Sequence, residues 1–390
     1  MTIQLVDIFY PNVFKRYSVK YNIFRDLYEK DLVGIEIRGI DFKLAQNIKK
    51  IILTNKEICY NTGKKGDTSC DLLVLGYYGI FEELSKEIIA IGNEELGLKV
   101  ARTIRNITEY ENQSIQIAHK NFLMDRAHVM GILNVTPDSF SDGGKYLDKS
   151  AAIEHGVKLL EEGADILDVG GESSRPGSDY INAEEELNRV IPVIQEILKN
   201  KKDAILSIDT TKSKVAYEAL KCGVKIVNDI SSFDVDDQML STVKQFDAAL
   251  ILMHMKGSPK TMQQNPSYDD VVPEIYDFLN LKVELAKKAG IKNIIIDPGI
   301  GFGKRITDNF ELIKRLNEFK GIGHPILIGV SKKSFLGNAL DLKIDERENS
   351  TIVAETISIK NGARIIRTHN VKNTIQASRI NSLIDNPELV

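Results

Sequence analysis

The sequence lacks the features that mark an exported, disulfide-bonded or metal-stapled protein. Its 390 residues contain three cysteines, Cys59, Cys70 and Cys222, and their spacing is not that of a zinc site. A sparse, odd number suits a reducing cytoplasm, where cysteines usually act as small buried apolar side chains. The first residues do not combine a basic segment with an apolar one, so we expect no signal peptide and a cytoplasmic protein.

Long apolar runs and a strong excess of one charge are also lacking. No stretch approaches the ~20 apolar residues of a membrane-spanning helix. The net charge of −4 gives no general attraction for nucleic acid or anionic lipid, so any anion site must be local. We therefore expect neither a membrane nor a nucleic acid as partner.

An activated nucleophile is not apparent either. The six histidines are scattered, none has the spacing of a zinc site, and no catalytic triad stands out. Any chemistry should then depend on electrostatics and on the positioning of substrates.

What the sequence has is a repeating pattern of eight short apolar runs, each followed by a stretch suited to a helix. Continuous apolar runs are typical of parallel strands that helices cover on both faces. Eight such units close a (β/α)8 TIM barrel, an α/β fold whose chemistry sits at the carboxyl ends of the strands. A doubly wound open sheet is the alternative, because it produces the same alternation. The runs end at Asn134, Glu172, Asp209, Asn228 with Asp229, His254, Asp297, Lys333, and Arg367 with His369.

The pattern begins near residue 113, and a barrel of this type usually takes about 250 residues. We therefore divide the chain into a small N-terminal α/β region of unknown role, 1–112, and a barrel, 113–390. In the first region, 34–40 and 71–80 are predicted strands, 41–55 is a predicted helix, and 81–106 is predicted to form one or two helices. Residues 116–127 are predicted to form a hairpin that closes the barrel floor.

The barrel helices are predicted from the segments between the apolar runs. Three of them should end at Gly163, Gly223 and Gly290, because glycine is the common C-terminal cap. A final helix should follow Thr368. The seven helices before it, including those three, are expected at 149–163, 182–200, 211–223, 236–246, 268–290, 308–319 and 348–363.

Polar residues at the strand ends suggest two kinds of subsite. Asp209, Asn228 and Asp297 would converge on one cavity, where a ligand with a row of N–H groups would satisfy them. A single strand-end aspartate could equally cap the next helix. Beside Lys333, the set favours a polar heterocycle. Arg175 lies among hydroxyl groups in 170–178, and a guanidinium there suits a phosphate or carboxylate.

Several rim segments support this interpretation. The long loop 134–146 is a candidate lid, and Asn134 offers a neutral oxygen to a cation or an amide to an anion. Residues 297–304 are not a phosphate loop, because Pro298 replaces its first glycine, so we expect a turn that lets Phe302 face the cavity. His254 is expected to be neutral and to donate to the backbone, with Met253 beside it as packing surface.

Together these motifs resemble dihydropteroate synthase. The matching segments are MGILNVTPDSFSDGG, DVGGESSRPGS, IDT, VNDIS, MHMKGSPKTMQ, IIDPGIGFGK, GVSKKS and RTH, in this order. The resemblance runs from about residue 113 to the C-terminus and does not reach 1–112. It implies a pterin-binding barrel that joins 6-hydroxymethyl-7,8-dihydropterin diphosphate to p-aminobenzoate, releasing diphosphate.

The resemblance also implies roles for individual residues. The pterin would be held by Asp209, Asn228, Met253, Asp297, Phe302 and Lys333. The p-aminobenzoate would be framed by Phe140, Ser174, Arg175, Pro176, Phe302 and Ser334. The diphosphate would meet Asn134, Arg175, Arg367 and His369, with Mg²⁺ on Asn134. Catalysis would rest on Asp142, Lys333 and Arg367, with Asp142 stabilising a pterin cation in a dissociative substitution. Family members usually pair through barrel helices, so a homodimer is expected.

Two other functions compete with this one. A folate-binding methyltransferase barrel has a similar pocket, but it should lack the 134–146 loop, the SRPG turn and the basic residues for diphosphate. A non-catalytic pterin-binding barrel should have lost Asn134, Asp297, Lys333 or His369, and all four are present. For 1–112 we favour a stabilising or oligomerisation role over a regulatory module or a small enzyme.

Overall fold

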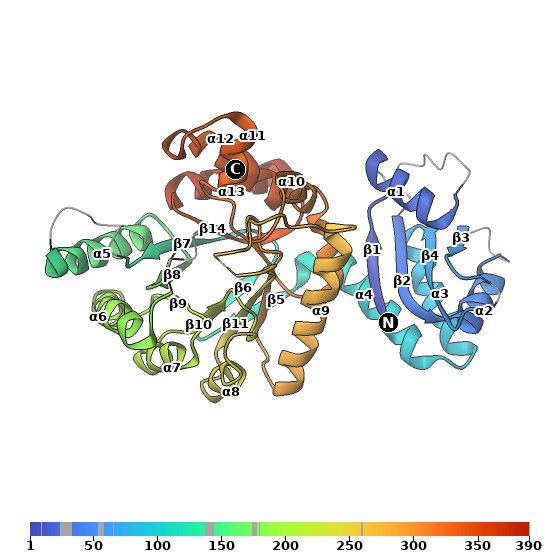
Figure 1. Cartoon of the computed structure of the whole chain (residues 1–390), viewed down its shortest axis with the longest axis horizontal. Coiled ribbons are helices and arrows are strands. Elements are labelled where there is room, and N and C mark those ends of the chain that lie inside the picture. The colour runs from blue at the N-terminus through green and yellow to red at the C-terminus, as the bar shows by residue number, and fades with distance from the viewer. Residues whose placement is uncertain are drawn as a thin grey trace. The chain divides into compact units, whose positions relative to one another are not determined.

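The computed structural model describes residues 1–8, 10–23, 33–53, 58–64, 66–136, 144–173, 178, 180–258 and 260–389. The chain forms two compact units, shown in Figure 1. The first comprises Met1–Glu111 and Asn317–Gly323, and the second comprises Asn112–Leu316 and His324–Val390. Among the described residues, no helix has the length and apolar character needed to cross a membrane.

The second unit is a closed barrel of parallel strands, and this confirms the predicted TIM barrel over the open sheet. In chain order its strands are β7 (His128–Asn134), β8 (Ile166–Gly170), β9 (Leu206–Asp209), β10 (Ile226–Asp229), β11 (Ala249–Met253), β12 (Ile294–Asp297), β13 (Ile326–Ile328) and β14 (Ala363–Thr368). Each strand pairs in parallel with the next, and β14 pairs with β7 to complete the ring.

Helices follow the strands and lie outside them (Figure 1). Gly163, Gly223 and Gly290 have φ of 104°, 114° and 93°, as helix-ending glycines commonly do, which confirms the three predicted caps. The helices are α5 (Gly144–Glu161), α6 (Ala183–Asn200), α7 (Ser213–Cys222), α8 (Met239–Gln245), α9 (Val271–Ala289), α10 (Ile306–Lys314), α11 (Ser334–Leu340), α12 (Glu348–Lys360) and α13 (Val371–Asp385).

Some predicted boundaries were wrong. The helix expected at 308–319 is α10 followed by a 3-10 segment, Leu316–Ile322, because the apolar period continues through both and Leu316 and Phe319 are buried in the second. Strand β13 ends at Ile328, five positions before Lys333, because the chain turns there with Lys333 N donating to Val330 O. The short helix α11 was not predicted.

A hairpin closes one end of the barrel, as predicted. Strands β5 (Ser114–Ile117) and β6 (Lys120–Leu123) pair antiparallel. Buried apolar side chains of the hairpin and of the following residue pack against the beginnings of the barrel strands: Ile115, Ile117, Phe122 and Met124 against Met130, Ile166, Ile226, Ile295 and Ile365. This apolar floor leaves the polar ends of the strands at the opposite mouth.

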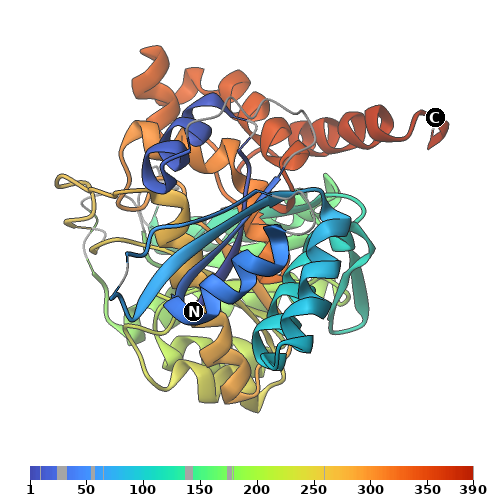
Figure 2. The same cartoon turned by 90° about the vertical axis from the view of Figure 1, so that its right-hand side faces the viewer.

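The first unit is built on an antiparallel sheet with strand order β1-β2-β4-β3 (Figure 2). One face packs against α2 (Phe42–Leu53), α3 (Tyr78–Ala90) and α4 (Glu94–Thr108), and the other carries α1 (Pro11–Tyr21). Two predicted strands correspond to β2 (Val33–Asp41) and β4 (Ser69–Gly76), although 77–80 are not part of β4 because α3 begins at Tyr78. Strands β1 (Thr2–Val6) and β3 (Ile58–Asn61) and helix α1 were not predicted.

A buried charge lies at the centre of this sheet. Glu36 accepts hydrogen bonds from Tyr21 Oη at 2.7 Å, from Arg38 Nη1 at 2.7 Å and from Lys20 Nζ at 2.8 Å. Burial alone would raise the pKa of Glu36, but Arg38 and Lys20 lower it below its ordinary value. Residues 317–323 of the unit are bonded to its strand β1, since Gln4 Nε2 donates to the buried Glu318 Oε2 at 3.0 Å.

The floor should account for much of the stability of the barrel. Phe122 is fully buried, so Phe122→Ala should reduce the free energy of unfolding by about 3–5 kcal/mol in a urea titration of the full chain. The neighbouring Leu123 is 47% exposed and serves as the matched control, because Leu123→Ala removes little buried surface. Equal losses in the two variants would contradict a packed floor.

Candidate active site

The strand register brings the polar strand ends to one rim. Asn134 lies opposite Gly170, Gly170 opposite Asp209, and Asp209 opposite Asn228, around four neighbouring strands. Further round, Met253 of β11 lies opposite Asp297 of β12. Because the strands are parallel, these residues all emerge at the mouth opposite the hairpin floor. The structure therefore brings together residues that the sequence predicted to meet.

Arg367 of β14 reaches two carboxylates on the other side of this mouth. Its Nε donates to Asp168 Oδ2 at 2.6 Å, and its Nη2 donates to Asp209 Oδ2 at 2.7 Å. Asn228 Nδ2 also donates to Asp168 Oδ2, at 3.0 Å. These bonds fix the guanidinium and the amide relative to each other.

Asp168 was missed by the sequence analysis. It is fully buried in the middle of β8, inside the run ILDVG. A signal was present, because an acid inside a continuous apolar strand is costly unless a cation or a donor reaches it. Its partners could not be inferred, since they come from β10 and β14.

One guanidinium serves two carboxyl groups in this corner. Burial raises the pKa of Asp209 to about 7, and Arg367 opposes this rise while Asp168 adds to it. Burial alone would lower the pKa of Arg367, but the two carboxylates raise it. A ligand that donates N–H groups here would stabilise the second carboxylate.

A second cluster lies where β12 and β13 end. Asp297 Oδ1 accepts from Gly299 N at 2.7 Å, and burial raises the pKa of Asp297 against the opposing effect of Lys333. Burial also lowers the pKa of Lys333 to about 8, with Asp297 acting against it. Lys333 Nζ donates to Ile300 O and lies 4.5 Å from the centre of the Phe302 ring. Aromatic and ionisable groups thus lie side by side.

Three of the remaining predicted residues have a described place, and the other five do not. His369 is held by Ser331, with Nδ1 3.0 Å from Ser331 Oγ, and Ser334 is the first residue of α11. Met253 is buried, and its carbonyl accepts from Ser232 Oγ at 2.9 Å. The others fall outside the described residues: Phe140, Asp142, Ser174, Arg175 and Pro176.

His254 was predicted to be neutral and to donate to the backbone. Burial, reinforced by Lys304, lowers the pKa of His254 to about 2, so the ring is neutral. Its Nδ1 faces Lys304 Nζ at 3.0 Å, a partner that was not predicted. Lys304 is a long side chain that folds back under its own loop, which the sequence did not reveal.

A buried lysine beside β8 was also missed. Lys212 Nζ lies 2.5 Å from Glu172 Oε2 and 2.7 Å from Glu186 Oε2. Glu172 Oε1 in turn accepts from Ile181 N at 3.2 Å, so this carboxylate bonds both to Lys212 and to the chain just before α6.

A cavity of about 370 Å³ opens beside Asp209, within the size range of small-molecule sites. Its wall mixes hydroxyl groups, charged groups and apolar side chains. The lining residues are Glu172, Ser173, Ser178, Tyr180, Asp209, Thr210, Thr211, Ile230, Val235, Met255, Gly257, Ser258 and Lys260.

Comparison with known proteins places this geometry in a family. Residues 130–369 match the pterin binding enzyme family. Dihydropteroate synthase of Escherichia coli K12 is 42% identical over 259 residues, which are 66% of this chain and 91% of that protein. The Clostridium beijerinckii enzyme of the same name is 40% identical over 274 residues, 69% of this chain and 99% of that protein. The chain belongs to the dihydropteroate synthase family.

Solved structures of dihydropteroate synthases are also similar to this chain. The Yersinia pestis enzyme with a sulfonamide drug complex has a TM-score of 0.66 and 37% identity, covering 70% of this chain and 99% of that one. The Xanthomonas albilineans enzyme in complex with 7,8-dihydropteroate has a TM-score of 0.63 and 35% identity, covering 70% of this chain and 99% of that one. Dihydropteroate synthase membership decides against the folate-binding methyltransferase barrel.

Removing the charge of Asp168 should loosen the two side chains that bond to it at the mouth. In Asp168→Asn, Arg367 and Asn228 lose their shared carboxylate. A hydrogen bond to a charged group contributes about 1.5–3 kcal/mol, so kcat/KM for dihydropteroate formation should fall about 10- to 100-fold. Steady-state kinetics would measure this.

The control for this substitution is Asp165→Asn. Asp165 precedes β8 at the floor end and pairs with Lys120 at 2.8 Å, so its loss should reduce stability and leave kcat/KM within about twofold. Full activity in Asp168→Asn would show that the mouth does not depend on this carboxylate.

Proposed function

We infer that the protein condenses 6-hydroxymethyl-7,8-dihydropterin diphosphate with p-aminobenzoate to form 7,8-dihydropteroate and diphosphate. The observation that carries this inference is the meeting of Asp209, Asn228, Asp297, Lys333 and Arg367 at one barrel mouth. The relatives support it. The Xanthomonas albilineans dihydropteroate synthase has been solved with 4-aminobenzoic acid and with 7,8-dihydropteroate.

The pterin offers hydrogen-bond donors that suit the carboxylates of the mouth. Its edge presents an amino group next to a ring N–H, and one carboxylate such as Asp297 accepts both together. Asp209 and Asn228 would meet further polar atoms of the bicycle, and Lys333 would donate to a ring acceptor. Asn228 and Asp297 are buried, so a hydrogen bond from the ligand would satisfy groups that water reaches poorly.

Positive charge should surround the leaving diphosphate. Arg367 is already oriented by Asp168 and Asp209, and His369 follows it by two positions on the same strand end. Arg175 would join them from the segment after β8. These groups would stabilise the negative charge that develops as the diphosphate departs.

We propose Mg²⁺ as the metal, with Asn134 as its protein ligand. The described residues hold no group of three or more His, Cys, Asp or Glu side chains suited to a metal. Mg²⁺ suits a site with a single protein ligand, since it commonly takes one or two protein oxygens together with substrate phosphates. When bound, the ion would neutralise charge on the diphosphate.

The absence of a strong base in the proposed mechanism follows from the nucleophile. An aromatic amine is neutral and nucleophilic at pH 7. In the dissociative scheme the bond between the pterin methylene carbon and the diphosphate oxygen breaks first. Asp142 would stabilise the resulting cation, the amine nitrogen then forms the C–N bond, and it releases one proton to solvent. Full activity of Asp142→Ala would argue against this scheme.

The assembly is proposed to be a homodimer in the cytoplasm. Helices α12 and α13 pack together and expose Val353, Ile357, Ile380 and Ile384, which are 46–67% exposed. An apolar surface of this kind usually marks a contact. The three cysteines form no disulfide, as a reducing compartment requires. A monomer in sedimentation at micromolar concentration would contradict the dimer.

A turnover assay tests the proposed reaction. The full chain, given both substrates and Mg²⁺, should form dihydropteroate and diphosphate in equal amounts, followed by chromatography. Asp297→Asn should lower kcat/KM for the pterin substrate by about 100-fold or more, since a buried charged acceptor is lost. Asp203→Asn, on the surface, is the control. Failure of the wild-type chain to form product would contradict the proposed reaction.

Metal dependence provides a separate test. A chelator should abolish turnover and added Mg²⁺ should restore it, because the leaving diphosphate would lose its counter-charge. Asn134→Ala should raise the Mg²⁺ concentration for half-maximal turnover about tenfold, while Asn200→Ala, on an exposed helix end, should not. Undiminished turnover after chelation would exclude the proposed metal role.

A further inference from the structure

Lys304 is a buried lysine that the proposed reaction leaves without a role. Its side chain is 3% exposed, and its Nζ lies 3.0 Å from His254 Nδ1, 3.0 Å from Phe302 O and 3.3 Å from His254 O. All three acceptors are neutral. Burial lowers the pKa of Lys304 well below its ordinary value. Burying an ammonium group against neutral acceptors is costly, so its place here needs a reason.

The contacts of Lys304 join two neighbouring strand ends. His254 follows β11, whereas Phe302 belongs to the loop 298–304 after β12. The loop lies directly on the end of β11: at Gly299, with φ of 71°, a β-carbon would come within 1.9 Å of His254 O. At Gly303, with φ of 65°, a β-carbon would come within 2.3 Å of Lys256 O. Glycine at both points permits the close approach, and Lys304 then bonds to both sides.

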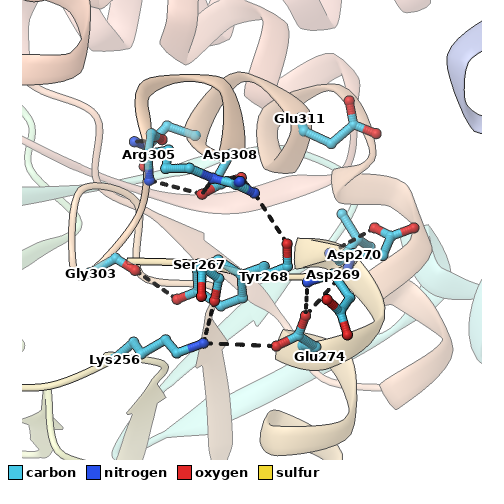
Figure 3. A network of polar contacts seen from close by, with 12 residues as sticks. Lys256, Ser267, Tyr268, Asp269, Asp270, Glu274, Gly303, Arg305, Asp308 and Glu311 are labelled. Atoms are coloured by element: carbon cyan, nitrogen blue, oxygen red, sulfur yellow. Dashed lines mark hydrogen bonds and ion pairs between the residues drawn. The ribbon is translucent and has the colours of Figure 1, made fainter. Parts of the chain in front are cut away.

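The outer side of the same loop is tied to the segment before α9 (Figure 3). Tyr268 Oη donates to Gly303 O at 2.7 Å, and Arg305 Nη2 donates to Tyr268 O at 3.3 Å. Lys256 Nζ in turn donates to Ser267 O. The loop is therefore bonded through the Gly303 carbonyl to Tyr268 and through the Phe302 carbonyl to Lys304.

This loop carries part of the mouth. It starts directly after Asp297, its Ile300 carbonyl accepts from Lys333, and its Phe302 ring lies against the Lys333 ammonium. A shift of the loop would move all three groups. Lys304 bonds to the carbonyl of Phe302 itself, two residues away, and so fixes the backbone that aims the ring.

We propose that Lys304 is a positioning residue for the pterin subsite: by bonding to His254 and to the Phe302 carbonyl it locks the 298–304 loop onto the end of β11. Lys304 acts through Asp297, Phe302 and Lys333 and does not touch the ligand. The identity of that ligand as a dihydropterin diphosphate rests on the proposed function.

Direct binding of dihydropterin diphosphate to the full chain, measured by calorimetry, tests this role. Lys304→Met should raise the Kd about tenfold, the effect of losing one or two hydrogen bonds. His254→Leu removes the other half of one contact and should raise the Kd in the same direction. In the double variant the Kd should not exceed that of the weaker-binding single variant, because the two side chains form one contact.

Arg364→Met is the matched control. Arg364 is also a buried cation bonded to backbone carbonyls, those of Met124, Ile359 and Ala363, but it lies at the start of β14. Its loss should lower Tm and leave the Kd within about twofold. A merely structural Lys304 would behave in the same way.

The outcomes distinguish a failure of the proposed function from a failure of the positioning role of Lys304. If the wild-type chain binds no dihydropterin diphosphate, the proposed function fails. If the wild-type chain binds it and folded Lys304→Met binds equally well, only the positioning role is overturned. Additive effects in the double variant would also overturn it. Should Lys304→Met not fold, His254→Leu and Lys304→Gln supply the same comparison.

Discussion

One guanidinium shared by two buried carboxylates sets the geometry of the mouth. Arg367 comes from β14, and its partners Asp168 and Asp209 come from β8 and β9, two and three strands further round the barrel. Asp168 is fully buried in an apolar strand, where an acid is costly unless a cation or a donor reaches it, and both Arg367 and Asn228 reach it. Because one cation meets two acids, the corner keeps an excess of acceptors, which suits a heterocycle rich in N–H groups.

The rest of the barrel keeps this polar cluster at one end. The hairpin fills the opposite end with apolar side chains, so ligands can reach the polar strand ends at the mouth alone. Helices outside the strands make the strands apolar on both faces, and this leaves the strand ends and the loops as the places for charge. A site of this kind binds and orients its substrates, which agrees with the absence of a nucleophilic triad in the sequence.

Buried lysines bond to residues of the rim in two places. Lys212 bonds to Glu172 and Glu186, and Lys304 bonds to His254 beneath the loop after β12. Both are long side chains that reach back into the protein from a surface loop. The first unit has its own buried charge, Glu36, whose satisfaction by Tyr21, Lys20 and Arg38 accounts for an acid at the centre of an otherwise apolar sheet.

The sequence by itself determined the barrel, the hairpin floor and the three glycine caps, because these follow from local apolar periodicity and from backbone conformations that glycine favours. It also placed Asn134, Asp209, Asn228 and Asp297 at one mouth, since parallel strands end on the same side. Only the tertiary structure showed which groups Asp168, Lys212 and Lys304 bond to, because their partners lie far away in the chain. Pairing through space decides whether a buried charge is tolerated, and no local pattern encodes it.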